Sequence, residues 1–163
     1  PEGTAGAPRR RGRLMNRGKS FESRSRARRR ALQALYQWQI TGQEAGDILE
    51  QFLAVQDMSG VDEAYFEQLL RGVVAGQEGL DEGLQPFLDR PIGQVDLMER
   101  VVLRIGAFEL LNCPELPYRV VLDECVDLAH RFGSEQGHSY VNAVLDRAAR
   151  QWRSAETDPA GEA

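Results

Sequence analysis

The stretch DLMERVVLRIGAFELL, residues 96–111, predicts a helix that is apolar nearly all round. A helix of this kind is covered by other elements on every side. Asp96 and Glu99 at its beginning fit the residue preferences of a helix N-terminus. We therefore expect residues 96–111 to form the buried centre of an all-α fold.

Amphipathic patterns on both sides of this stretch predict the helices that surround it. Behind Asp62, the apolar doublets at 65–66, 69–70 and 73–74 repeat every four residues, as in the stripe of an amphipathic helix. Neither strand alternation nor an internal repeat is visible, so the class is all-α with about seven helices. The remaining helices are expected over 25–42, from Asp47 with Glu50 as a capping-box pair, and over 80–88, 117–133 and 140–152.

The composition predicts one compact cytoplasmic domain. A chain of 163 residues with 42% hydrophobic residues suits a single core. Cys113 and Cys125 are too few for a disulfide framework, and both fall in apolar runs, which favours a reducing compartment. No apolar stretch of about 18 residues, as a membrane span would need, is present. No apolar core follows the basic N-terminus, as a secretory signal would require.

The net charge of −5 combines two segments of opposite sign. Residues 1–30 hold ten arginines and one lysine against two acids, or +9, and residues 31–163 hold nine cations against 23 acids, or −14. A basic block of this kind is typical of arms that bind nucleic acid. The alternative is a solvated tail that binds nothing specific.

The same segment sets the expected domain boundaries. Residues 1–23 are rich in Arg, Gly, Pro and Ser, and so predict a disordered, flexible basic arm. Residues 24–154 are expected to form the all-helical domain, and residues 155–163, which are small, polar and acidic, a disordered tail. Met15 is an alternative start of the native chain.

No pattern in the sequence indicates catalysis. There is no Gly-rich phosphate loop, no nucleophile elbow and no pair of histidines four apart on one helix. His130 and His138 form no standard zinc spacing with Cys125. We expect a protein that is not an enzyme and that has no metal or cofactor.

The segment FGSEQGHSY, residues 132–140, joins the last two predicted helices and is the second candidate for recognition. A helix N-terminus rich in small residues presents unpaired backbone N–H groups that suit phosphate. His138, Ser139 and Tyr140 add donors and a ring on which an unpaired RNA base could stack. The alternative is that Tyr140 begins the apolar stripe of the last helix and belongs to the core.

Four segments of the sequence carry a likeness to a known family: RRRALQALYQWQI at 28–40, LRIGAFEL at 103–110, PYRVVLDECVDLA at 117–129, and FG at 132–133 followed by YVNAVL at 140–145. With these segments the sequence resembles the NusB family over roughly residues 24–150. Gln136 and Gly137 depart from the family, because this loop is often acidic in its members. Tyr140 stands where Phe is more common, and Ala143 where Gly is usual.

This resemblance implies two small packed helical bundles and a transcription antitermination factor within the RNA polymerase antitermination complex. Such a factor binds the boxA element of single-stranded ribosomal-RNA transcripts together with NusE, a small-subunit ribosomal protein. Family members differ in whether they pair with themselves, so a homodimer stays open. Carried over by position, the RNA-binding residues would be Arg24, Arg26, Arg28, Arg29, His138, Ser139 and Tyr140.

Tyr36 and Glu99 match positions that face the protein partner in the family, although Tyr36 could be core packing and Glu99 only a capping-box acid. The alternative function is a non-enzymatic helical scaffold that binds protein without specific RNA recognition. A third reading is an enzyme, because NusB-like domains are appendages of RNA methyltransferases. Against it, this chain lacks the Gly-rich strand-to-helix turn of a methyl-donor site.

Overall fold

The structure is a computed structural model that describes residues 9–159, with side chains from residue 20 onward. These residues form seven α-helical segments, two short 3-10 helices and no strand, which confirms the all-α class. The elements in chain order are α1 (Arg9–Thr41), α2 (Ala45–Val55), α3 (Glu63–Leu84), η1 (Gln85–Phe87), η2 (Ile92–Gln94), α4 (Leu97–Asn112), α5 (Tyr118–Phe132), α6 (Gly137–Trp152) and α7 (Ser154–Thr157).

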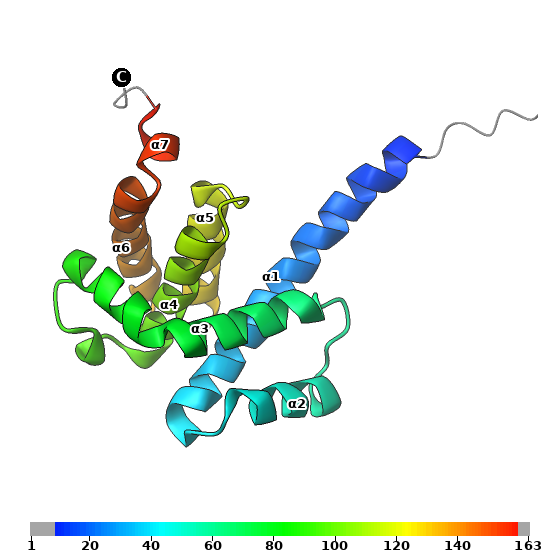
Figure 1. Cartoon of the computed structure of the whole chain (residues 1–163), viewed down its shortest axis with the longest axis horizontal. Helices are drawn as coiled ribbons and strands as arrows, with labels where there is room; N and C mark the ends of the chain where they lie inside the picture. Colours follow the sequence, from blue (N-terminus) through cyan, green and yellow to red (C-terminus); the bar gives the residue numbers. More distant parts are fainter. Residues whose placement is uncertain (1–8, 160–163) are drawn as a thin grey trace, which may run out of the picture.

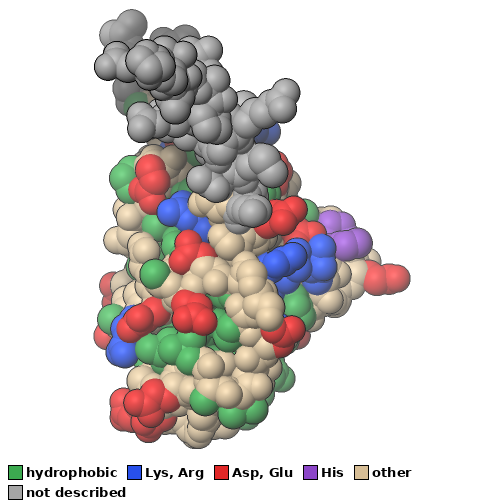
Figure 2. All heavy atoms as spheres, turned by 90° about the vertical axis from the view of Figure 1, so that its right-hand side faces the viewer, with side chains coloured by type: hydrophobic (Ala, Val, Ile, Leu, Met, Phe, Trp, Pro, Cys, Tyr) green, Lys and Arg blue, Asp and Glu red, His purple; other side chains and the backbone are tan. Residues whose placement is uncertain are grey.

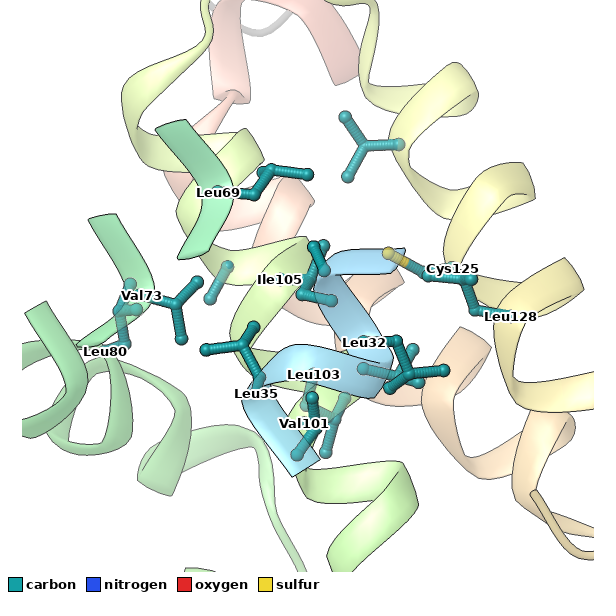
Figure 3. Packing of buried hydrophobic residues seen from close by; sticks show 14 of the residues in the cluster. Leu32, Leu35, Leu69, Val73, Leu80, Val101, Leu103, Ile105, Cys125 and Leu128 are labelled. Atoms are coloured by element: carbon teal, nitrogen blue, oxygen red, sulfur yellow. The ribbon is translucent and has the colours of Figure 1, made fainter. Parts of the chain in front are cut away.

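Helix α4 is the centre of the molecule, as its apolar pattern predicts. It packs against α1, α3, α5 and α6. Figure 1 shows it between the group formed by α1, α2 and α3 and the pair formed by α5 and α6. Leu103 and Ile105 of α4 meet Leu32 of α1, Leu69 of α3 and Leu128 of α5 in one core (Figure 3). Removing this apolar surface from water is the main force that holds the two bundles together.

Helix boundaries follow the capping residues at several ends. The side chain of Asp62 accepts a hydrogen bond from the Tyr65 amide at 3.0 Å, and Asp96 caps α4 in the same way. Gly42, with φ +69°, follows α1 in the left-handed region that favours glycine. Helix α2 differs from its prediction, because it begins at Ala45 without a side-chain cap. Asp47 therefore lies in its first turn, and the expected capping box is wrong.

The predicted helix over 80–88 does not exist as a separate element. Helix α3 continues through Gly79 and Gly83 to Leu84, because Leu80 and Leu84 extend its buried stripe. Pro86 then lies at the beginning of η1, where the missing N–H of proline costs no helical hydrogen bond. The seventh α-helical segment is instead α7, after α6.

The first and last helices of the structure extend beyond the helices predicted from the sequence. Helix α1 begins at Arg9, earlier than the predicted helix over 25–42. Helix α7 follows α6 and is tied to the domain by Glu156, which accepts a hydrogen bond from the Tyr118 amide at 2.7 Å. Residues 1–8 of the predicted arm (1–23) and residues 160–163 of the predicted tail (155–163) lie outside the described residues. No helix in the described part of the chain combines the length and apolarity that crossing a membrane requires.

Candidate nucleic-acid interface

Arg26 and Arg29 point outward from the middle of α1. Arg26 is exposed and Arg29 is half-buried. Among the described residues, neither side chain has a hydrogen bond or ion pair. Guanidinium groups that are not held in a hydrogen bond or ion pair are available to bind phosphate, so Arg26 and Arg29 remain candidates for RNA contacts.

Arg28 was predicted to contact RNA, but in the structure it is a core residue. Its side chain is 1% exposed, and its Nε lies 3.0 Å from both carboxylate oxygens of Glu109. Its Nη2 lies 2.9 Å from Glu109 Oε2, and its Nη1 lies 3.5 Å from Glu124 Oε2. A guanidinium enclosed in this way cannot reach an RNA phosphate, so the prediction that Arg28 contacts RNA is wrong for this structure.

The pair formed by Arg28 and Glu109 is the centre of a buried polar network. The Tyr65 hydroxyl donates a hydrogen bond to Glu109, and the Ser25 hydroxyl donates to Glu124 at 2.9 Å. Burial opposes the charge of Arg28, but the Glu109 carboxylate raises the pKa of this guanidinium above its usual value. Burial and Glu109 also raise the pKa of Tyr65. The network joins α1 to α3, α4 and α5 and so fixes how α1 is rotated.

Arg24 occupies an intermediate position one turn before Arg28. Its guanidinium lies 4.9 Å from the centre of the Tyr65 ring, and its Nε lies 4.0 Å from Asp62 Oδ2. About a third of its side chain is exposed, 35%. The Arg24 side chain therefore contributes to the packing of α1 on α3, and its exposed third remains accessible to a ligand.

The three predicted residues at the beginning of α6 point in different directions. Ser139 is exposed, and the ring of the half-buried His138 packs edge-on against His130 of α5, with 5.3 Å between centroids. The Tyr140 hydroxyl donates to Asp89 Oδ1 at 2.9 Å. Tyr140 is half-buried, so it both packs on the core and keeps part of its ring accessible.

Arg90 is a candidate that the sequence does not reveal. Its guanidinium lies 5.1 Å from the centre of the Tyr140 ring, in a cation–π arrangement. Asp89 Oδ1 pairs with Arg90 Nε at 2.8 Å, and the hydrogen bonds from Arg90 and Tyr140 lower the pKa of Asp89 to about 2. The two side chains lie 50 positions apart in sequence, and no motif links them. Arg90 extends the surface on which a base could stack.

The N-terminus of α6 already has an internal carboxylate beside it. Glu99 is only 9% exposed, and its Oε1 accepts a hydrogen bond from the Ser134 hydroxyl at 3.0 Å. A Cβ at Gly137 would lie 2.3 Å from the same oxygen, so a larger residue there would have to displace the Glu99 side chain. The Glu99 carboxylate offsets the partial positive charge at the N-terminus of α6. It therefore weakens the prediction that this helix end binds phosphate. Glu99 is also not a capping-box acid, since Asp96 alone caps α4.

The basic helix and the beginning of α6 lie on the same side of the molecule, with α5 between them. Arg29 and Asp127 of α5 line one hollow, and Asp127 is one turn before His130, which contacts His138. Figure 2 shows arginine side chains beside histidine on this face, with acidic side chains among them. The two predicted regions are therefore neighbours, but acids of α5 stand between them.

The site contains no obvious centre for metal chemistry. Within residues 9–159, no three His, Cys, Asp or Glu side chains are grouped closely enough to hold a metal ion. Both cysteines are buried, and burial raises the pKa of each thiol. The arrangement suits recognition through cations and rings.

Comparison with known proteins identifies the family of this chain. The family described as "NusB family" matches residues 25–150. The transcription antitermination protein NusB of Nitrosococcus oceani is 59% identical over 133 residues, which are 82% of this chain and 89% of that protein. The protein of the same name from Xanthomonas axonopodis pv. citri is 53% identical over 138 residues, 85% and 87% of the two chains.

The solved structure of T. maritima NusB superposes with a TM-score of 0.71 at 27% identity, and the match covers 78% of this chain and 91% of that one. The family match spans the helices from α1 to α6 that build the core and the surface described above. The chain therefore belongs to the NusB family.

Proposed function

We propose that this protein is a transcription antitermination factor that binds the boxA element of ribosomal-RNA transcripts together with the small-subunit ribosomal protein NusE. Relatives that are 53–59% identical are named transcription antitermination proteins. The observation that carries the proposal is the pair of outward arginines, Arg26 and Arg29, on a helix whose other side is fixed in the core. Cations without acidic partners are what a polyanion needs.

The RNA surface that we propose combines two kinds of contact. Arg24, Arg26 and Arg29 supply phosphate contacts, which give affinity without reading the sequence. Tyr140 with Arg90, beside His138 and Ser139, offers a ring and a guanidinium plane for unpaired bases, which is the usual way in which single strands are read. Arg28 acts inside the protein by holding α1 in place.

The protein-partner surface is supported by apolar side chains that the fold leaves exposed. Ile40 at the end of α1 and Leu53 and Val55 of α2 are 59%, 43% and 79% exposed, and α1 and α2 pack together. Exposed large apolar side chains on two adjacent helices would suit a protein partner. Tyr36, which is half-buried on α1, remains our candidate for this contact. Glu99 would first have to leave its hydrogen bond with Ser134.

A titration of labelled single-stranded RNA separates the proposal from its alternative. We expect a boxA-containing RNA to bind at least about tenfold more tightly than a scrambled RNA of the same composition when NusE is present, a difference of about 1.4 kcal/mol. If boxA RNA and scrambled RNA bind with equal affinity, both in the presence and in the absence of NusE, the proposal is contradicted. The exposed apolar residues also fit a protein-binding scaffold, and that alternative predicts NusE binding with no preference among RNAs.

A further inference from the structure

Three hollows lie beside the outward arginines of α1, and the two that are lined by both arginines differ in charge. Arg26 and Arg29 line both. On the α5 side, a hollow of about 320 Å³ also contains Glu22, Glu124 and Asp127. On the other side, a groove of about 380 Å³ lies between α1 and the α2–α3 loop, residues 56–62. This α2–α3 groove is lined by Arg26, Arg29, Arg30, Asp57, Ser59 and Val61.

The balance of charge favours phosphate in the α2–α3 groove. It has three arginines against one carboxylate, whereas the α5 hollow has two arginines against three carboxylates. The one acid in the groove, Asp57, is turned toward its own loop, and its Oδ1 accepts a hydrogen bond from the Ser59 amide at 3.0 Å. On the α5 side, Glu124 is paired with Arg28 and Asp127 with Arg131, but the three carboxylates together still add negative charge that repels a phosphate. The α2–α3 groove presents mainly cations and a hydroxyl.

The far wall of the groove is fastened to α1. Arg30 Nε and Nη2 donate to the backbone oxygen of Asp57 at 3.1 and 2.9 Å, and Arg30 Nη1 donates to Gln33 at 2.9 Å. The two hydrogen bonds to Asp57 fix the loop beside the basic block, and the bond to Gln33 holds the Arg30 side chain along α1. A ligand that enters the groove therefore meets a formed site and does not have to order the loop first.

The position of Arg26 depends on Gly60. Gly60 has φ +70°, which favours glycine, and a Cβ at this position would lie 1.9 Å from Arg26 Nη1. The guanidinium thus rests directly on the loop backbone at the edge of the groove. This contact holds a flexible side chain near the place where a phosphate would sit.

We propose that the α2–α3 groove holds phosphate groups of the bound single-stranded RNA, so that the strand crosses α1 on the side of the α2–α3 loop and not on the side of α5. The inference rests on the proposed RNA binding. It adds Ser59 and Arg30 to the interface and assigns the phosphodiester backbone as their ligand.

The first test introduces a carboxylate into the groove. Ser59→Glu keeps the backbone amide that bonds to Asp57, and the matched control is Gln151→Glu, which adds the same charge at an exposed position of α6. We expect Ser59→Glu to weaken RNA binding about tenfold, the worth of one charge-assisted contact. We also expect the slope of log affinity against log salt to flatten by about 0.7. The control should stay near wild type.

Equal effects of Ser59→Glu and Gln151→Glu on RNA binding would overturn the proposal that the α2–α3 groove holds RNA phosphates, and would leave the proposed function intact. A wild-type protein that binds no RNA would overturn both.

The second test uses the unaltered protein and locates the strand directly. We expect the backbone amide NMR signals of Ser59 and Gly60 to shift when RNA is added, and to shift little with inorganic phosphate at the same phosphate concentration. Shifts at Asp127 and His130 with none in the loop would overturn the proposal. So would loop shifts that appear with inorganic phosphate alone, since they would show a site for the free anion.

Discussion

The guanidinium of Arg28 and the carboxylate of Glu109, 81 positions apart in sequence, are paired inside the protein through contacts of 2.9–3.0 Å. The pair turns one member of the basic block into a core residue. Because Arg28 faces inward, Arg26 and Arg29, which lie at other angles around α1, face outward. The same contact therefore stabilises the fold and presents the cations that we assign to RNA.

Breaking this pair should be costly. We expect Arg28→Ala to lower the free energy of unfolding by about 3–5 kcal/mol, since it leaves the Glu109 carboxylate buried without its partner. The control is Arg71→Ala, which removes an exposed ion pair with Glu67 and should cost less than about 1 kcal/mol. Urea denaturation followed by circular dichroism measures both. Similar losses in the two variants would show that the buried pair has no special role.

Arg153, which follows α6, should stabilise the C-terminal end of α4. Its guanidinium donates to the backbone oxygens of Leu110, Leu116 and Cys113 at 2.8, 2.8 and 3.0 Å. We expect Arg153→Ala to lower the free energy of unfolding by about 2–3 kcal/mol, because these carbonyl groups lose a charged donor. Arg150→Ala, at an exposed position three residues earlier, is the matched control. A melting temperature that falls equally in both variants would contradict this role.

The free energy of unfolding should fall between about pH 9 and pH 11 because of the Cys113 thiol. Burial and the nearby Glu109 raise the pKa of this thiol from its usual value of 9.0 to about 11. The folded state thus favours the neutral thiol, a contribution that is fully present below pH 9 and is lost as pH rises through about 11. We expect the free energy of unfolding of wild type to decline relative to that of Cys113→Ala over this range. A difference between the two proteins that is independent of pH would rule this out.

Tyr140 should contribute to RNA affinity through its ring. We expect Tyr140→Ala to cost about 1–3 kcal/mol of RNA binding if a base stacks there. Tyr140→Phe keeps the ring and removes only the hydrogen bond to Asp89, so its RNA affinity should stay near that of wild type. Fluorescence anisotropy with the same RNA compares the three proteins. If Tyr140→Ala only lowers the melting temperature and binds RNA normally, the ring is a core residue.

Much of the fold can be predicted from the sequence, because local patterns determine it. The apolar run 96–111 predicts the central helix, and Asp62 and Asp96 mark the true beginnings of two helices. The errors arise where context overrides a local signal. Gly79 and Gly83 do not end α3, since the buried Leu80 and Leu84 carry the helix past them.

The site is less predictable, because its geometry depends on long-range contacts. A signal for the burial of Arg28 does exist: it lies one turn before Leu32 and two turns before Leu35, in the buried stripe of α1. Glu109, an acid in the apolar second half of α4, is the matching signal. Nothing local indicates that Arg90 lies over Tyr140 or that Glu99 meets Gly137, since the chain joins these pairs only through tertiary packing.

The most direct test of the account is the salt dependence of RNA binding after the outward arginines are removed. Substitution is preferable to deletion of the basic block, because Ala27 and Arg28 are buried in the core. The double variant Arg26→Ala/Arg29→Ala is compared with Arg71→Ala/Arg150→Ala, which removes the same charge from exposed positions elsewhere. We expect the slope of log affinity against log salt to flatten by about 1.4 in the first variant, about 0.7 for each phosphate contact, and to stay unchanged in the second. Identical slopes in both double variants would contradict the claim that these two arginines bind the RNA backbone.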